Sequence, residues 1–281
     1  MRIGANLAHF KYFGEACFQV MKEYGFSCAD YGIDGELRGK TEEDYRSSIL
    51  HDAALAKEAG VTIWQVHGPW RCPPHDETPE FRAERFEVMQ RSIRLTGEIG
   101  VRYWVIHPLM PFGVDSGDFM LNRFYQINEE FFRALLPIAK ENNVTICFEN
   151  MPMSRLEISP PEKILAFIHK INDENFKMCL DTGHAACLGV NPADAVRVAG
   201  KDLCVLHVHD NMGKMDDHMV PCTGVIDWKD FGKALTEISF DGVFSLESAF
   251  GNYFLPHAST KTRLRTLRVI LDEIVPGGVT E

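Results

Sequence analysis

Short apolar runs alternate with longer amphipathic stretches along the whole chain. The apolar runs, rich in β-branched residues as strands are, cover residues 2–7, 26–31, 61–67, 101–107, 144–149, 176–181, 203–207 and 243–247. The stretches with apolar side chains at helical spacing cover residues 13–24, 42–59, 80–99, 125–141, 160–170, 192–199, 228–238 and 257–274. Gly60 and Gly100 directly follow two of these stretches, at the position where glycine commonly ends a helix. The pattern therefore predicts eight strands that alternate with eight helices.

Strict alternation of strands and helices predicts a parallel sheet with right-handed crossovers. Eight such repeats within 281 residues favour one α/β fold, the closed (β/α)8 TIM barrel. The competing fold is a doubly wound open sheet, but its usual Gly-x-Gly-x-x-Gly motif does not follow the first predicted strand. No linker or low-complexity segment interrupts the pattern, so we expect a single domain over residues 1–281.

Composition narrows the class of protein further. Hydrophobic residues make up 45% of the chain, enough for a large core, yet no run approaches the ~20 apolar residues that span a membrane. The first residues, Met1-Arg2-Ile3-Gly4, fit the start of a strand and not a signal peptide. The eight cysteines include no Cys-x-x-Cys pair, so we expect buried, reduced thiols in a cytoplasmic protein.

The net charge of −11 argues against a nucleic-acid partner, because binding to a phosphate backbone depends largely on Lys and Arg. One dense basic run, residues 261–268, has leucines at helical spacing. We expect this run to form the exposed face of a terminal helix and not a nucleic-acid-binding surface.

The loops that follow the predicted strands are long, whereas the turns that precede them are short. The long loops cover residues 68–79, 108–124, 150–159 and 209–227. Because TIM barrels carry their active sites on the strand-to-helix loops, this asymmetry predicts a functional rim at the carboxyl ends of the strands. The loop 108–124 is long enough to close over such a site or to contact a second subunit in a homo-oligomer.

Four predicted strands in succession end in a polar side chain that can bind a metal ion. These residues are Glu149, Asp181, His207 and Glu247. Three carboxylates and one imidazole at the same rim would repel one another, and a divalent cation would remove that repulsion. The ligand types suit Mn²⁺, Mg²⁺, Co²⁺ or Zn²⁺ without choosing among them. His209 is excluded from this set, because a turn signal follows it and the strand is expected to end before it.

At these residues the chain resembles the xylose isomerase-like TIM barrels, a superfamily that includes AP endonuclease family 2. The matching motifs are Glu149-Asn150, Asp181-Thr182-Gly183-His184, His207 with Asp210-Asn211, and Asp216-Asp217-His218 followed by Gly224-Val225-Ile226-Asp227-Trp228. The superfamily includes sugar and sugar-phosphate isomerases and epimerases, inosose-processing enzymes and the endonuclease IV group. The resemblance extends over essentially the whole chain.

The resemblance implies a metal-dependent reaction on a sugar or polyol. Glu149, Asp181, His207 and Glu247 match the metal tetrad of the superfamily. Glu149 and Glu247 also match the acid and base that exchange a proton on opposite faces of a ketose. The metal would polarise the carbonyl and stabilise an enediolate, because a C–H next to a ketone is otherwise too weak an acid for a carboxylate. We therefore expect a metal-dependent isomerase or epimerase, with an inosose or polyol dehydratase as an alternative.

A second set of residues leaves another activity open. The resemblance makes His67, His107, His184, Asp216 and His218 either substrate contacts or ligands of further metal ions. In the endonuclease IV group, equivalent residues join the tetrad to hold three zinc ions, so a zinc phosphodiesterase acting on abasic DNA is the runner-up. One ion is expected here and up to three are possible. The negative charge and acidic rim residues argue against DNA. These rim residues are Asp76, Glu77, Asp115, Asp118, Asp216 and Asp217.

The loops also suggest how a sugar would be held. Trp70 follows His67 closely, and its ring is the preferred stacking surface for the apolar C–H face of a sugar. The loop 216–224 lacks the arginine that contacts substrate in the ketose 3-epimerases, and Cys222 stands where many relatives have glycine. These departures concern the specific 3-epimerase activity and leave the four predicted metal ligands untouched.

Overall fold

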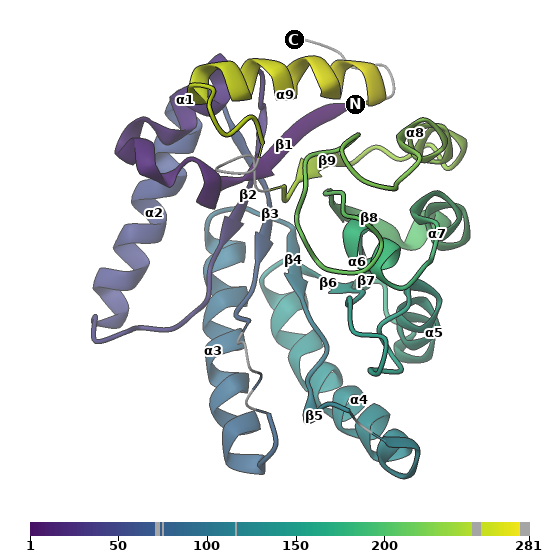
Figure 1. The fold of residues 1–281 in the computed structure, drawn as a ribbon. Coiled ribbons are helices and arrows are strands. Elements are labelled where there is room, and N and C mark those ends of the chain that lie inside the picture. Colours follow the sequence, from purple (N-terminus) through teal and green to yellow (C-terminus); the bar gives the residue numbers. More distant parts are fainter. Residues whose placement is uncertain (71–73, 75, 116, 249–253, 276–281) are drawn as a thin grey trace.

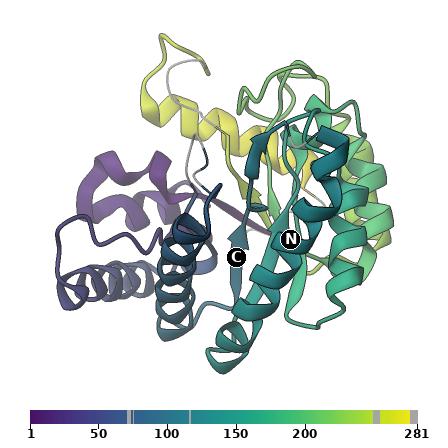
Figure 2. The ribbon, with the colours of Figure 1, turned by 90° about the horizontal axis from the view of Figure 1, so that it is seen from below.

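The computed structural model describes the chain except residues 71–73, 75, 116, 249–253 and 276–281. Eight strands form one parallel sheet with helices around its outside (Figures 1 and 2). They are β1 (Arg2–Asn6), β2 (Cys28–Gly32), β3 (Thr62–His67), β4 (Tyr103–Ile106), β6 (Thr145–Glu149), β7 (Phe176–Asp181), β8 (Leu203–His207) and β9 (Val243–Leu246). Val208 joins β8 to β9 through hydrogen bonds with Ser245 and Glu247, which closes the sheet into a barrel. The predicted (β/α)8 fold is confirmed.

The predicted helices are present, most of them within a few residues of the expected bounds. They are α1 (Cys17–Glu23), α2 (Glu42–Ala59), α3 (Pro79–Glu98), α4 (Gly117–Glu141), α5 (Pro161–Ile171), α7 (Pro192–Ala199), α8 (Trp228–Glu237) and α9 (Thr260–Ile274). Thr41, Thr78 and Ser259 each accept a hydrogen bond from a backbone N–H in the first turn of the helix that follows. Gly60 ends α2 with φ of 68°, as expected for a glycine C-cap.

Three elements differ from the sequence prediction. The first helix begins at Cys17 instead of residue 13, because Gly14 has φ of 60° and interrupts the preceding 3-10 turns. The predicted loop 108–124 contains the short strand β5 (Pro111–Val114) and the first turns of α4. A further helix, α6 (Thr182–Cys187), starts directly after β7, where the Asp181 carboxylate accepts the N–H of His184 as an N-cap.

The core has two parts, one outside the barrel and one inside it. Outside, the rings of Phe132, Phe148, Phe167 and Phe176 pack between strands and helices. Inside, small side chains fill the narrow interior: Val105, Cys147, Cys179 and Val205, all fully buried. Each of these lies two positions before a polar residue at a strand end, namely His107, Glu149, Asp181 and His207. Since alternate residues of a strand share a face, the polar residues point toward the barrel axis at the carboxyl rim.

The cysteines agree only in part with the expectation of buried thiols, because Cys187 and Cys204 are half-buried and Cys222 is exposed. Cys17, Cys28, Cys147 and Cys179 are buried, and no disulfide joins the cysteines that the structure describes. Burial raises the pKa of the Cys147 thiol well above its usual value, which makes it a poor nucleophile. Within the described residues, no helix has the length and apolar character required to cross a membrane.

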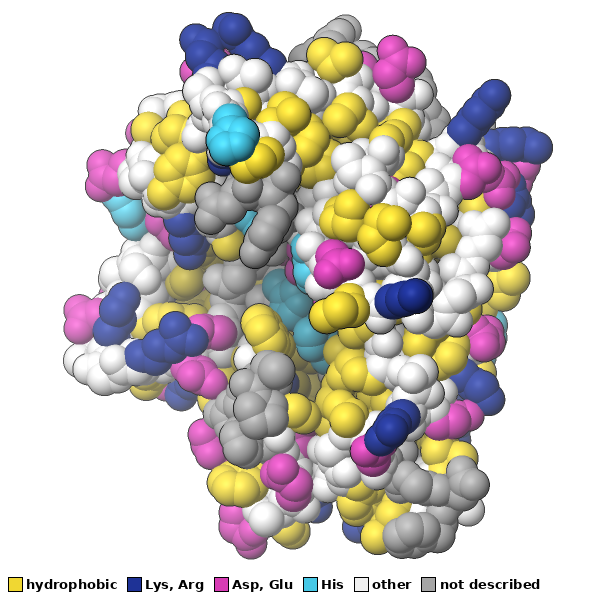
Figure 3. All heavy atoms as spheres, viewed as in Figure 1, with side chains coloured by type: hydrophobic (Ala, Val, Ile, Leu, Met, Phe, Trp, Pro, Cys, Tyr) yellow, Lys and Arg dark blue, Asp and Glu magenta, His cyan; other side chains and the backbone are white. Residues whose placement is uncertain are grey.

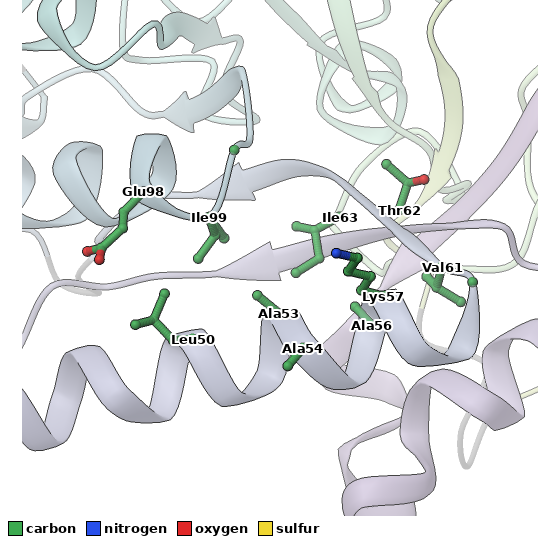
Figure 4. A pocket seen from close by; sticks show the side chains of 12 residues that line it. Leu50, Ala53, Ala54, Ala56, Lys57, Val61, Thr62, Ile63, Glu98 and Ile99 are labelled. Atoms are coloured by element: carbon green, nitrogen blue, oxygen red, sulfur yellow. The ribbon is translucent and has the colours of Figure 1, made fainter.

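A groove of about 580 Å³ lies at the opposite end of the barrel from the polar rim (Figure 4). Leu50, Ala53 and Ile63 form much of its apolar wall, and Lys57 and Glu98 border it. The groove runs along α2 beside the turns that enter β3 and β4. Chemistry at the strand ends therefore has to be sought on the other rim.

Candidate metal centre

Four predicted ligand residues meet at the carboxyl rim. One oxygen or nitrogen atom from each of Glu149, Asp181, His207 and Glu247 lies within 4.8 Å of the others. His207 Nδ1 is 2.8 Å from Glu149 Oε1 and 3.3 Å from Glu247 Oε2. The first three residues are fully buried, whereas the side chain of Glu247 is 16% exposed. Figure 3 shows histidine side chains at the bottom of a hollow on this face of the molecule.

A second group lies beside the first, on α6 and on the loop after β8. His184 Nε2 is 3.2 Å from Asp216 Oδ2, and His218 Nε2 is 3.3 Å from the same oxygen. His184 also connects the two groups, because its Nδ1 lies 3.8 Å from Glu149 Oε1. The ligand atoms of His184, His209, Asp216 and His218 all lie within 4.8 Å of one another.

A third group involves the other face of Glu149. His107 Nε2 is 3.1 Å from Glu149 Oε2, and His67 Nε2 is 3.7 Å from that oxygen. The rings of His67 and His207 are stacked with centroids 5.5 Å apart. Glu149 thus lies where all three groups meet, with its two oxygens facing different histidines.

The exclusion of His209 from the site was wrong. Strand β8 does end at His207, but the backbone stays extended, with bridges from Val208 to Leu246 and from Asp210 to Met219. Alternation therefore continues, and His209 points to the same side as His207. Its Nε2 lies 3.0 Å from Asp181 Oδ2, and its ring stacks on His218 with centroids 4.1 Å apart.

The loop after β8 is held by the buried carboxylate of Asp210. This carboxylate accepts hydrogen bonds from the backbone N–H of Gly224 and from Nε1 of Trp228. Asn211 adds a hydrogen bond from its side-chain amide to the carbonyl of Gly183 on α6. These contacts explain the Asp-Asn and Gly…Trp motifs, since they fix the loop that carries Asp216 and His218.

The carboxylates of the site have very different proton affinities. Burial would raise the pKa of Glu149, but the positive charges of His207 and His107 outweigh burial and hold this pKa well below its usual value. The pKa of Asp181 is likewise lowered, since His184 and His209 outweigh burial. Burial raises the pKa of Glu247 to about 7, and the nearby charge of Glu149 adds to that effect. Near neutral pH, Glu247 can therefore both hold and give up a proton.

The histidines also differ from one another. Burial and the neighbouring His107 lower the pKa of His67 to about 4, so this ring is neutral near pH 7. Burial acts in the same direction on His184 and His218, but carboxylates reverse it. The charge of Asp181 and the contact with Asp216 raise the pKa of His184 to about 10, and Asp216 raises that of His218 to about 9.

Buried polar atoms without hydrogen bonds indicate that the site fits a divalent cation, and this observation does not depend on the sequence pattern. Glu149 Oε2 and His209 Nδ1 are buried atoms that make no hydrogen bond to the described residues. Buried polar atoms are normally paired, and Glu149 Oε2 has only its ion-pair contacts with His107 and His67, so a bound cation would give this oxygen a partner. Carboxylate oxygens combined with imidazole nitrogens are the donor types that Mn²⁺, Co²⁺ and Zn²⁺ accept.

The predicted stacking residue and the predicted acidic rim residues differ in their exposure to solvent. Trp70 is 60% exposed, and its predicted role in stacking on a sugar stays a prediction. The assignment of Asp76 to an acidic rim was wrong, because its carboxylate is buried, accepts the N–H of Met110 and faces Arg85. Asp216 contacts His184 and His218 and is also exposed, as expected for a rim residue. Glu77, Asp115 and Asp217 are exposed, as expected for rim residues, whereas the side chain of Asp118 lies outside the described part of the chain.

One buried carboxylate at the site was missed. Asp30 on β2 is 1% exposed, and its Oδ2 lies 3.0 Å from His207 Nε2. The signal in the sequence was a single acidic residue within an apolar strand, residues 26–31. It was overlooked because Asp30 lies before the strand end and not at it.

Comparison with known proteins places this geometry in a family. The family model described as a xylose isomerase-like TIM barrel matches residues 18–269. The uncharacterized protein MJ1311 of Methanocaldococcus jannaschii is 29% identical over 191 residues, which are 65% of this chain and 63% of MJ1311. The chain thus spans slightly less than two thirds of the length of that relative. A D-psicose 3-epimerase of Enterocloster bolteae is 25% identical over 259 residues, 85% of this chain and 80% of that enzyme.

Two further similarities extend the comparison. The crystal structure of the IOLI protein with a bound zinc atom has a TM-score of 0.77 at 18% identity and covers 98% of both chains, which shows a shared fold. A probable endonuclease 4 of Acholeplasma laidlawii is 26% identical over 175 residues, 58% of each chain. The family match covers most of the chain, including the strands that carry the site. The protein therefore belongs to the xylose isomerase-like TIM barrel family.

Proposed function

We propose that this protein is a divalent-metal-dependent isomerase or epimerase of sugars or sugar phosphates. The observation that carries the proposal is the convergence of two carboxylates of unlike pKa, those of Glu149 and Glu247, on one imidazole, that of His207. Pairs of titratable groups with separated pKa values suit proton transfer in two roles. The similarity to a D-psicose 3-epimerase over most of the chain supports a sugar as the substrate.

Glu149, Asp181, His207 and Glu247 would hold the cation, and their ligand types suit Mn²⁺, Zn²⁺, Mg²⁺ and Co²⁺ alike. When bound, a divalent cation supplies electrostatic stabilisation of the negative charge that develops on a substrate carbonyl oxygen. Asp181 is fixed for this task, because one of its oxygens accepts the N–H of His184 and the other faces His209.

The two glutamates would exchange the proton at the carbon next to the carbonyl. Glu149 is fully buried and stays ionised, so it would act as the base that removes the proton. Glu247 is partly exposed and has a pKa of about 7, so near neutral pH it can carry the proton that it would deliver to the opposite face. This transfer would invert the carbon, and proton exchange with water would return both carboxylates to their starting states.

Isotope exchange tests the proposal directly. The protein loaded with Mn²⁺ should incorporate deuterium from D₂O into at least one ketose of a panel, next to the carbonyl, as measured by mass spectrometry and NMR. Glu247→Gln should reduce the exchange by about 10²–10⁴-fold, because it removes a group that transfers the proton. Absence of exchange from every ketose, with metal content verified, would overturn the proposal. A product lighter by one water would indicate the dehydratase alternative instead.

The second candidate function is a zinc phosphodiesterase acting on abasic DNA. The observation in its favour is that two further groups of possible ligands lie beside the tetrad: His67 with His107 and Glu149, and His184 with His209, Asp216 and His218. About three zinc ions per chain by elemental analysis, together with cleavage of a duplex with an abasic site, would establish this activity. One ion per chain and an intact duplex would exclude the phosphodiesterase activity and favour the sugar reaction.

Metal binding should release protons near neutral pH. Glu247 has a pKa of about 7 and His207 a pKa raised well above its usual value by Cys179 and Glu149, despite burial, so both carry protons at pH 6.5. A cation must displace these protons, so its apparent affinity should rise as the pH increases toward and above 7. Calorimetric titration with Mn²⁺ in two buffers of different ionisation enthalpy measures the release. Glu247→Gln should release fewer protons, and identical enthalpies in both buffers would contradict the prediction.

A further inference from the structure

Asp30 approaches the one imidazole of the tetrad from the side away from the other ligands. His207 has Nδ1 directed at Glu149 and Glu247, at 2.8 and 3.3 Å. Its other nitrogen, Nε2, lies 3.0 Å from Asp30 Oδ2, an ion-pair contact that is not aligned as a hydrogen bond. Each nitrogen of this ring therefore has a carboxylate on its own side, and only Nδ1 faces the predicted ligands.

Asp30 is itself held firmly in the barrel interior. Gln65 on β3 donates its side-chain N–H to Asp30 Oδ2 at 3.2 Å and lies 3.3 Å from the carbonyl of Leu206. Leu206 directly precedes His207, so Gln65 couples Asp30 to the strand that carries the ring. Asp30, Gln65 and His207 are all at most 1% exposed. Water therefore has little access to replace these contacts.

A carboxylate at this depth is costly unless it is paired. Asp30 Oδ1 makes no hydrogen bond to the described residues. The carboxylate of Asp30 therefore does not serve to cap or brace the backbone through this oxygen. An apolar side chain would fill the same place in a strand interior without that cost. The contacts with His207 and Gln65 distinguish aspartate from such a side chain, and of these two only His207 is a predicted metal ligand.

We propose that Asp30 is a positioning residue that keeps a proton on Nε2 of His207 and directs the lone pair of Nδ1 toward the cation site. A carboxylate that accepts the second N–H of a ligating imidazole fixes both its tautomer and its ring orientation. This inference rests on the proposed function, because it assigns His207 as a ligand. In this role Asp30 would act through His207 and not as a ligand itself.

Two substitutions of Asp30 and one matched control test this role by metal binding, independently of turnover. Asp30→Ala should weaken Co²⁺ binding by about 10–100-fold and change the visible absorption of the bound ion. Asp30→Asn retains a neutral acceptor, so the loss should be smaller, about tenfold or less. Asp202→Asn is the control, because Asp202 also faces a histidine, His169 at 2.9 Å, but lies at the other end of β8.

The readouts separate positioning from general support of the fold. The ¹⁵N shifts of His207 in the Zn²⁺-loaded protein should report an Nε2–H tautomer in the wild type and in Asp30→Asn. If both Asp30 variants bound Co²⁺ with wild-type affinity and wild-type absorption, the proposal would be overturned, whatever their thermal stability. If Asp30→Ala does not fold, wild-type Co²⁺ affinity and absorption in Asp30→Asn alone would overturn it. Failure of the wild type to exchange deuterium, with Co²⁺ bound tightly and weakened in the variants, would overturn the proposed function and leave the role of Asp30 supported.

Discussion

Glu149→Gln should abolish both metal binding and deuterium exchange. Its carboxylate faces His207 at 2.8 Å on one oxygen and His107 at 3.1 Å on the other, so one substitution weakens both the tetrad and the group formed with His67 and His107. We expect the affinity for Mn²⁺ to fall by more than ~100-fold, beyond the loss caused by removing an outer partner of a ligand. Removing one partner of buried ion pairs also lowers the free energy of unfolding of the metal-free protein by about 3 kcal/mol.

Glu247→Gln is the matched substitution, because it makes the same chemical change at the partly exposed carboxylate. Its effect on stability should be smaller, since the ionised form of Glu247 is already disfavoured by burial and by Glu149. The two variants should therefore differ in stability while both lose exchange. Chemical denaturation and Mn²⁺ titration measure the two quantities separately. If Glu149→Gln retained wild-type affinity for Mn²⁺, the tetrad would not be the metal site.

The barrel could be predicted from the sequence because its elements follow simple periods. Short apolar strands such as Tyr103–Ile106 alternate with amphipathic helices, which end at glycines such as Gly60. The same alternation placed Glu149, Asp181 and His207 on one rim, since parallel strands of a barrel present their carboxyl ends together. These predictions depended on local pattern and on one topological rule.

The residues that were missed depend on structure beyond that pattern. His209 joins the site because bridges formed by Val208 and Asp210 keep the chain extended past the strand end. Asp30 joins it because β2 lies across the barrel from β8, a proximity that no spacing along the chain reveals. Helix α6 was missed since it is short and begins immediately after a strand, with the tetrad residue Asp181 as its N-cap.

Gly183→Ala should destabilise the protein and disrupt the site together. Gly183 lies on α6 directly under the ring of His209, and an added Cβ would come within 1.9 Å of Cε1 and 2.3 Å of Nδ1 of that ring. The ring cannot easily withdraw, because His209 is fully buried and stacked on His218. Overpacking of this kind lowers the free energy of unfolding by about 2–3 kcal/mol. Displacement of His209 should also release Asp181 and weaken Mn²⁺ binding.

Gly32→Ala is the control, since a Cβ at Gly32 meets no atom within 4 Å and its backbone needs no left-handed conformation. It should leave stability nearly unchanged, or raise it slightly by restricting the unfolded chain. A second substitution separates the two effects of Gly183→Ala: combining it with His209→Ala removes the clash and should restore much of the lost stability, but not the metal affinity. If Gly183→Ala alone were as stable as Gly32→Ala, the close packing of His209 on α6 would be refuted, and with it the reason that glycine occupies this place in the Asp181-Thr182-Gly183-His184 motif.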